Sequence, residues 1–384
     1  MVRARDRGFR YFRDGPINAQ SMKKGLPAIL AIIALVIGCA KEEDDPVTPD
    51  PPAPASPVVF DLDAVPYDSL STYRFFQGAL ADQSPSAGVL PYDVITPLFS
   101  DYAHKSRFVW MPEGVRASYV KDSTILDFPD GAVLIKNFYY DHVLPDNTRR
   151  ILETRLLYKK DGQWLFADYT WNAEQTEALL DMNGSTVPLQ WMDDGGTVHD
   201  EQFRIPAEAE CHTCHKKNGQ NTPVGPKPQN LNRTYDYVDG AMEQLAKWEA
   251  VGYLQSGYPT TVETVAKWDD ATEDLTRRVR AYLDMNCAHC HSAGGHCDYR
   301  PMRLSWHETT DPANMGVCVP PDDQLLPELI HIVDAGSTAR SMMYYRLTST
   351  DETVRMPLLG RTVVHQEAVD LIATWINGLT PPCD

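Results

Sequence analysis

The sequence lacks any apolar run long enough to cross a membrane as a helix: residues 25–38 give 14 apolar positions, whereas a spanning helix needs about 20. It also lacks an excess of positive charge. Lys and Arg number 35 against 53 Asp and Glu, for a net charge of −18, and no basic cluster lies beyond the first 25 residues. Such a chain repels phosphate backbones, so we expect no nucleic-acid partner and favour a basic protein partner instead.

Length and composition exclude a small disulfide-stapled scaffold. The chain has 384 residues, of which 43% are apolar and 23% charged. This is a soluble, globular composition, and the length suggests two or three domains that each bury a core. Eight cysteines and eleven histidines are neither rare nor dense, so their positions decide what they do.

The apolar run has the features of an export signal. Lys23 and Lys24 precede it, and it ends in residues 36–39 (VIGC), which resemble the lipobox of bacterial lipoproteins. The pattern predicts a leader of residues 1–38, acylation of the Cys39 thiol, and a lipoprotein of the periplasm. Ala40 after this cysteine favours the outer membrane. The alternative is a plain secretory signal with a chance cysteine.

Two copies of one short motif carry the chemistry. Residues 211–215 (CHTCH) and 287–291 (CAHCH) both have the spacing that attaches haem c. Two cysteines three positions apart lie on one face of a helical turn, where both reach the haem vinyl groups. The following histidine turns its imidazole onto the iron. The motifs predict two covalently bound haem c groups on Cys211, Cys214, Cys287 and Cys290, with His215 and His291 as iron ligands.

Other uses of these cysteines fit less well. A zinc ribbon needs its cysteine pairs about 15–20 residues apart, but 72 residues separate Cys214 from Cys287. A thioredoxin-like dithiol needs a βαβ setting, which the pattern lacks. The inner histidines, His212 and His289, are expected to lie on the solvent side of their loops and not to bind iron.

A second axial ligand is expected for each iron. For the C-terminal haem we predict Met356, in residues 354–358 (VRMPL), over Met302, Met342 and Met343, which we assign to the core. His365 is expected to be a helix cap or a surface residue. For the first haem we favour Met242, while other ligands or an open site remain alternatives. These other ligands are His104, His142, His199, Met182, Met192 and, less favoured, Met285.

Three cysteines lie outside the motifs. In an oxidising compartment spare thiols tend to pair, and Cys297 with Cys318 is the expected bridge. Cys383 would then be a free thiol or pair elsewhere.

The hydrophobic pattern divides the mature chain into a strand-rich part and a part of helices and loops. Asp161-Gly162 predicts a tight hairpin between two strands. Helices are expected at residues 173–180, 239–251, 273–285 and 366–378. The fold class we predict is an α+β multidomain chain: an N-terminal antiparallel β sandwich or barrel-like domain followed by a mainly α-helical c-type cytochrome region.

Five segments follow from this reading. They are a leader at 1–38 (of which 1–21 reads as an upstream mis-start, since Met22 precedes the basic pair), a Pro-rich tether at 39–58, a β-rich domain at 59–205, a first haem-binding segment at 206–272, and a cytochrome c domain at 273–384.

The C-terminal segment resembles a class I cytochrome c domain. The resemblance rests on residues 277–283 (RRVRAYL), the second motif, the Met356-Pro357 loop and a closing helix with Trp375. Upstream, four short stretches resemble a family of two-haem c-type cytochromes of the bacterial envelope: residues 97–103 (PLFSDYA), 128–131 (FPDG), 153–157 (ETRLL) and 231–233 (LNR). The likeness covers most of the mature chain and implies the haem positions at His215, His291 and Met356.

The expected function is that of a lipid-anchored electron carrier whose partners are periplasmic redox proteins. A two-haem peroxidase or other haem redox enzyme, with its substrate site at the first haem and the β-rich domain, is the alternative. A β-type binding module with a recruited cytochrome part is a third.

Overall fold

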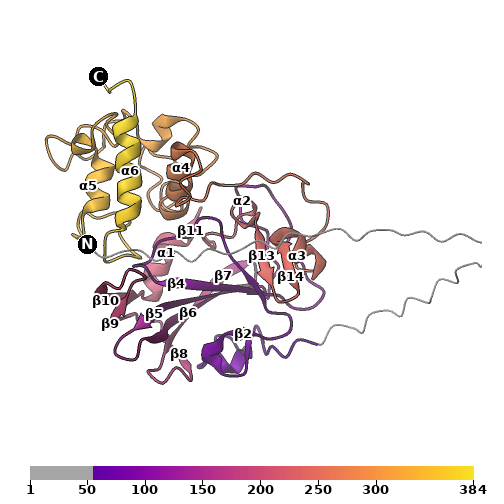
Figure 1. Cartoon of the computed structure of the whole chain (residues 1–384). Coiled ribbons are helices and arrows are strands. Elements are labelled where there is room, and N and C mark those ends of the chain that lie inside the picture. Colours follow the sequence, from indigo (N-terminus) through magenta and orange to yellow (C-terminus); the bar gives the residue numbers. More distant parts are fainter. Residues whose placement is uncertain (1–54) are drawn as a thin grey trace, which may run out of the picture. The chain divides into compact units, whose positions relative to one another are not determined.

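Apolar residues in alternation build one large antiparallel sheet, the main feature of this computed structural model, which describes residues 55–384 (Figure 1). The predicted leader, Cys39 and most of the tether lie outside the described residues. The sheet contains eight strands: β3 (Leu90–Tyr92), β4 (His104–Trp110), β5 (Val133–Val143), β6 (Thr148–Lys160), β7 (Gln163–Trp171), β8 (Ala178–Leu180), β9 (Ser185–Met192) and β10 (Val198–Ile205).

Strand β5 is the centre of the sheet. It pairs with β6 along one side and with β4 and the end of β9 along the other. The strand order is β10-β9-β5-β6-β7-β8, and β3 and β4 branch off through β5. The predicted hairpin at Asp161-Gly162 is confirmed: it joins β6 to β7, and both residues have positive φ, 52° and 73°.

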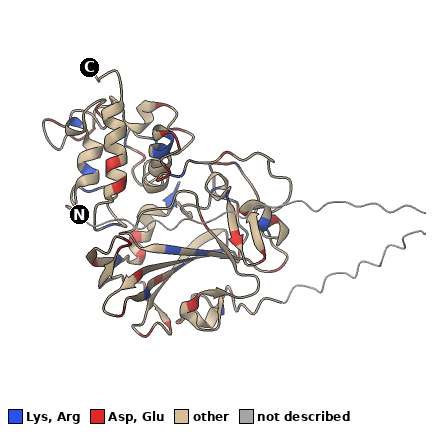
Figure 2. Cartoon of the chain, viewed as in Figure 1, with Lys and Arg blue, Asp and Glu red and all other residues tan. Residues whose placement is uncertain are grey.

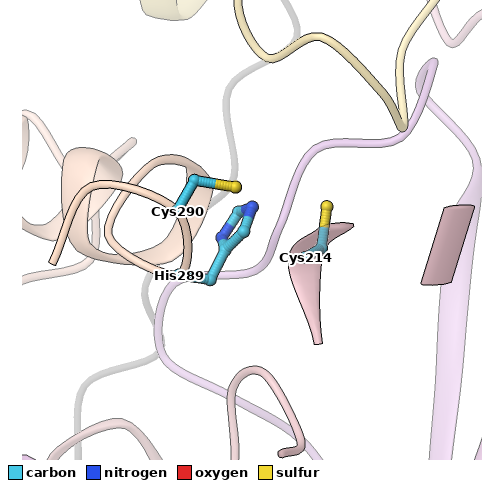
Figure 3. A group of neighbouring side chains, drawn as sticks. All are labelled: Cys214, His289 and Cys290. Atoms are coloured by element: carbon cyan, nitrogen blue, oxygen red, sulfur yellow. The ribbon is translucent and has the colours of Figure 1, made fainter. Parts of the chain in front are cut away.

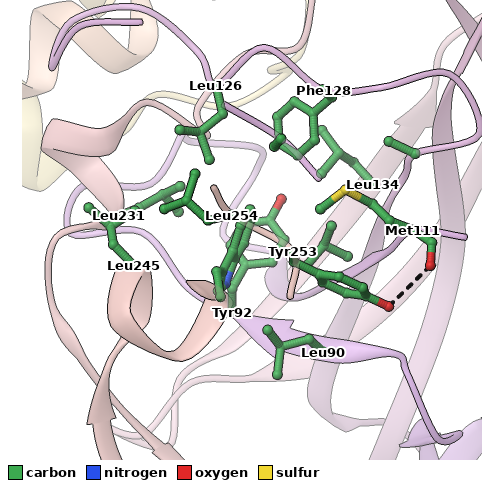
Figure 4. Packing of buried hydrophobic residues seen from close by; sticks show 14 of the residues in the cluster. Leu90, Tyr92, Met111, Leu126, Phe128, Leu134, Leu231, Leu245, Tyr253 and Leu254 are labelled. Carbon is green, nitrogen blue, oxygen red and sulfur yellow. Dashed lines mark hydrogen bonds between the residues drawn. The ribbon is translucent and has the colours of Figure 1, made fainter. Parts of the chain in front are cut away.

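Each face of the sheet is covered by a different part of the chain. Val133 and Ile135 of β5 pack on one face against the segment that precedes β3, around Tyr73. Leu134 points to the other face, where Phe128, Trp164 and Trp248 form a second core (Figure 4). This alternation is that of a strand buried on both sides. The second face also carries the functional site, beyond the edge of this core.

The chain after β10 forms short elements joined by long loops. They are α1 (Glu208–Cys214), β11 (Lys216–Lys217), β12 (Gln220–Asn221), α2 (Pro228–Leu231), β13 (Thr234–Tyr237), β14 (Gly240–Glu243), α3 (Gln244–Ala250), α4 (Leu275–Asn286), α5 (Met342–Thr348) and α6 (Gln366–Gly378). A two-stranded ribbon, β1 (Phe76–Gln77) with β2 (Ser84–Pro85), lies earlier in the chain. Helices α4, α5 and α6 share a core built around Leu283, Leu347 and Trp375.

The fold class predicted from the sequence is wrong. The described residues are mostly β, with six short helices, and no mainly α-helical cytochrome region follows the sheet. Between α4 and α5 the chain runs through turns, bends and two short 3-10 helices. Gly294-Gly295 and Pro320-Pro321 lie in this stretch, and both residue types disfavour a continuous helix.

Two of the four predicted helices are confirmed, at α4 and α6. At 173–180 the structure has a turn and strand β8 instead. Asn172 accepts hydrogen bonds at Oδ1 from the amides of Thr176 (2.9 Å) and Glu177 (3.3 Å), so it closes a turn rather than starting a helix. At 239–251 the first residues belong to the β13–β14 hairpin, which turns at Val238 and Asp239, and Gly240 begins β14 with φ 117°. Only α3 is helical.

The expected Cys297–Cys318 bridge is also wrong. Cys318 pairs with Cys383, which fastens the chain end after α6, and Cys297 is a buried free thiol. Spacing alone does not choose among three thiols, because loops bring distant residues together. None of the helices in residues 55–384 has both the length and the apolar character needed to cross a membrane.

Candidate functional site

The first motif lies at the end of α1, directly after the last strand of the sheet. Cys211 and Cys214 are half-buried on this short helix, and His215 ends it. His215 Nδ1 donates a hydrogen bond to the Thr222 carbonyl oxygen at 2.9 Å. Burial lowers the pKa of His215 to about 4. A neutral imidazole with Nδ1 protonated has its lone pair on Nε2, which is the state that binds a metal ion.

The second motif follows α4 without a break. The Cys287 amide donates to Leu283 O at 2.9 Å, and the His291 amide donates to Cys287 O at 2.9 Å. His291 is buried, and burial lowers its pKa to about 4. Its Nδ1 has no hydrogen-bond partner among the described residues. Buried polar atoms are seldom left unpaired in this way, so the site has an unsatisfied ligand group.

The two motifs lie against each other. Ligand atoms of Cys214, His289 and Cys290 are all within 4.8 Å of one another, and the His289 ring lies beside the two sulfur atoms (Figure 3). The loops behind them also touch, since the Asn218 amide donates to Gly294 O at 2.8 Å. A Cβ at Gly294 would lie 1.9 Å from Asn218 Oδ1, so this approach requires glycine. Segments 72 residues apart in the sequence therefore form one site.

A cavity of about 140 Å³ opens beside the first motif. Its wall includes strands β5 to β7, the α1 motif with residues 223–226, and α4 with residues 357–361. Residues 98–101, the end of β10 and His289 also line it. Two of the stretches behind the family resemblance, at 97–103 and 153–157, contribute Phe99 and Arg155 to this wall.

A second, smaller cavity of about 40 Å³ lies at the second motif. Met356 lines it together with Cys287, Cys290 and His291, so the structure brings the predicted ligand to the predicted site. The Met356 loop is held by the backbone: its amide donates to Arg346 O at 3.1 Å, and Arg361 Nε donates to its carbonyl oxygen at 2.9 Å. A thioether and an imidazole are an ordinary ligand pair for haem iron.

These donor sets fit haem c. At each motif two cysteine sulfurs and one neutral histidine line a cavity, and the thiols stand where the thioether sulfurs of an attached haem would be. A zinc ion held by Cys214, His289 and Cys290 is the competing use of the cluster, since these are zinc-type ligands. That ion would leave Cys211, Cys287 and the buried His291 without a role.

Other residues predicted from the sequence lie elsewhere. Met242 is 37% exposed on β14 and lines neither cavity, because the helix expected around it is a hairpin. His365 precedes α6 without a side-chain cap, and it is not a surface residue: its ring stacks on Phe99 at 4.0 Å between centroids. Tyr282 Oη and His365 Nδ1 are 3.1 Å apart. Burial lowers the pKa of His365 to about 4.

Sequence reasoning missed the charged part of the first cavity. Lys136, Arg155 and Asp168 lie on three neighbouring strands and line it. The available signal was a lysine within an apolar strand, at residues 132–140 (AVLIKNFYY), since lysine is rarely buried without a function or a partner.

Comparisons of the chain with family models, curated proteins and solved structures give no significant match.

Proposed function

We propose that this chain is a two-haem c-type cytochrome that carries electrons in the bacterial cell envelope. The observation that carries the proposal is the meeting of two attachment motifs, each with a neutral histidine beside a cavity. Haem c supplies a one-electron iron couple when bound.

The chain's own residues have separate roles in this proposal. Cys211, Cys214, Cys287 and Cys290 hold the two groups covalently. His215 would bind iron through Nε2, which the hydrogen bond from its Nδ1 to Thr222 leaves free. His291 would bind the second iron through a ring nitrogen, and Met356 would complete that site. Because Cys214 and Cys290 lie in contact range, the groups attached to them would be neighbours. Neighbouring redox centres allow electrons to move within one chain.

The resemblance to two-haem cytochromes of the bacterial envelope supports the proposed location in the cell envelope. The proposal places the protein in the periplasm, held by a lipid on Cys39 to the outer membrane, with redox proteins as partners. The net charge of −18 favours partners with a basic docking face. Nucleic acid is not among the proposed partners.

A haem peroxidase or related redox enzyme is the second candidate. Its support is the presence of Arg155 and Asp168 in the wall of the first cavity. Charged side chains beside a reactive centre are typical of catalysis, whereas an electron carrier needs only a closed site.

The two candidates differ in their response to peroxide. The full chain, made in a host with haem c maturation, is titrated with reductant and oxidant while its optical spectrum is recorded, and peroxide is then added. The carrier predicts two reversible one-electron steps and spectra unchanged by peroxide. A haem that reacts with peroxide in catalytic turnover would favour the enzyme, and a chain without haem would contradict both.

A further inference from the structure

One row of charged side chains crosses the sheet at the first cavity. The strand register places Arg107 of β4 opposite Lys136 of β5, Lys136 opposite Arg155 of β6, and Arg155 opposite Asp168 of β7. Paired residues on neighbouring strands project from the same face of a sheet. Figure 2 shows the basic residues as blue segments on these adjoining strands. Lys136 lies in the middle of the row.

Lys136 differs from its neighbours because it has no polar partner. Arg107 forms an ion pair with Asp93 at 2.6 Å, and Arg155 forms one with Glu153. In the adjacent row Lys105 donates to Ala103 O at 2.8 Å. For Lys136 Nζ, residues 55–384 contain no hydrogen-bond or ion-pair partner. Its Nζ lies 4.9 Å from the centroid of the Phe138 ring.

The surroundings of Lys136 favour an uncharged amine. Burial lowers its pKa well below the usual value, and the positive charges of Arg107, Lys105 and Arg155 lower it further, while Glu153 opposes them. An unpaired ammonium at this place would be costly. The neutral amine has a lone pair, and its side chain lines the same cavity as Cys211, Cys214 and His215.

Other groups in the wall of this cavity are poorer ligands for a second axial position. The wall contains no methionine, and its only imidazoles are those of His215 and His289. His289 lies against the sulfurs of Cys214 and Cys290, at the edge where the attached groups would join the chain. Burial raises the pKa of Tyr92 to about 12, which keeps this phenol protonated and a weak ligand.

We propose that Lys136 supplies the second axial ligand of the first haem, opposite His215. The inference rests on the proposed function, because it requires haem on Cys211 and Cys214. It gives the first site a strong-field ligand pair, so both irons of the protein would be low-spin and closed to small ligands.

The test uses the full holoprotein and compares Lys136→Ala with Lys105→Ala. Both changes remove a lysine from the same face of the sheet, but Lys105 does not line the cavity. Haem per chain and spin state are measured by optical and electron paramagnetic resonance spectroscopy. We expect two haems in every sample. Wild type and Lys105→Ala should be fully low-spin, whereas Lys136→Ala should have one high-spin haem of two, which added imidazole returns to low-spin.

Two further variants separate ligation from simple charge. Lys136→Arg should also give one high-spin haem, because a guanidinium does not lose its proton. Lys136→Met should remain low-spin, with the potential of one haem raised, since thioether ligation favours ferrous iron. If Lys136 acted only as a positive charge, Lys136→Met would lower that potential instead.

Three results would overturn the proposal: two low-spin haems in Lys136→Ala, one high-spin haem in the wild type, or conversion to high-spin by His289→Ala but not by Lys136→Ala. In all three cases two haems per chain would leave the proposed function standing. Fewer than two haems in the wild type would overturn both.

Discussion

At the scale of single residues, the fold sets the protonation state of the side chains that would bind haem iron. His215 is held in one tautomer by the Thr222 carbonyl oxygen, and burial keeps both His215 and His291 neutral. A protonated imidazole binds no metal, so this neutrality is a requirement of the site. The same low-polarity surroundings make Lys136 a candidate ligand rather than a surface charge.

Met356→Ala tests the second site. The variant should retain both haems, because attachment depends on the cysteines, but the potential of one haem should fall. A tenfold change in the preference of a ligand for one oxidation state moves a one-electron potential by about 59 mV, and we expect a fall of at least this order. Spectroelectrochemical titration measures it.

The control for this variant is Met242→Ala, which also removes a methionine, but at a position that is 37% exposed and lines neither cavity. It should leave both potentials as in the wild type. Unchanged potentials in Met356→Ala would refute Met356 as the ligand.

At the scale of elements, the Met356 loop is positioned by the sheet domain. Asp101 Oδ1 accepts hydrogen bonds from the amides of Thr362 at 2.7 Å and Val363 at 3.1 Å. Thr362 Oγ1 also lies 3.1 Å from Glu201 Oε1, on β10. These contacts join residues more than 160 positions apart in the sequence, so the loop's position depends on the sheet.

Asp101→Ala should loosen this loop. The change leaves two part-buried amides without an acceptor, which costs about 1 kcal/mol of unfolding free energy. Denaturant titration measures the loss, and hydrogen exchange at Thr362 and Val363 shows whether it is local. Asp101→Asn retains one carbonyl oxygen and should lie close to the wild type. An equal loss of unfolding free energy in Asp101→Ala and Asp101→Asn would show that the hydrogen-bond acceptor at position 101 does not stabilise the loop.

The sequence predicted elements where the local pattern decides the structure. Helices α4 and α6 have a continuous apolar stripe, and the Asp161-Gly162 turn needs positive φ, so all three were predictable. The helices expected at 173–180 and 239–251 are wrong because the turn that Asn172 closes and the hairpin before Gly240 outweigh the helical periodicity of the apolar residues. The predicted fold class is wrong because residues 287–341, expected to belong to a helical domain, form loops and turns.

The site was predictable only in part, for a related reason. Each attachment motif spans only five consecutive residues, so the sequence alone reveals it. In the structure, the cysteines and the last histidine of each motif line a cavity. The cross-strand row of Lys136, the position of Met242 on a hairpin and the Cys318–Cys383 pairing depend on register and loop paths between distant segments. Such non-local contacts have no signal in a single sequence.

At the scale of the whole molecule, buried tyrosines link stability to alkaline pH. Burial raises the pKa of Tyr92 to about 12, and burial also raises the pKa of Tyr73 and Tyr169, whose hydroxyl oxygens are 2.8 Å apart. In the unfolded chain these phenols ionise near pH 10. Their contribution to folding is therefore complete below pH 10 and is lost as the pH rises toward 12.

The free energy of unfolding should fall above pH 10 by up to about 1.4 kcal/mol per pH unit for each such tyrosine. Urea titrations at pH 9, 10 and 11 measure the slope. Tyr92→Phe has no proton to lose at this position and should show a shallower slope than the wild type. Parallel slopes would mean that Tyr92 ionises alike in both states.

The most direct test of the central claim is the haem content of the whole chain. Protein made with haem c maturation is denatured, its intact mass is measured, and the modified peptides are mapped. The account predicts two haems that survive denaturation, one on the peptide with Cys211 and Cys214 and one on that with Cys287 and Cys290. A chain of unmodified mass, or one that binds zinc through Cys214, His289 and Cys290 instead, would contradict it.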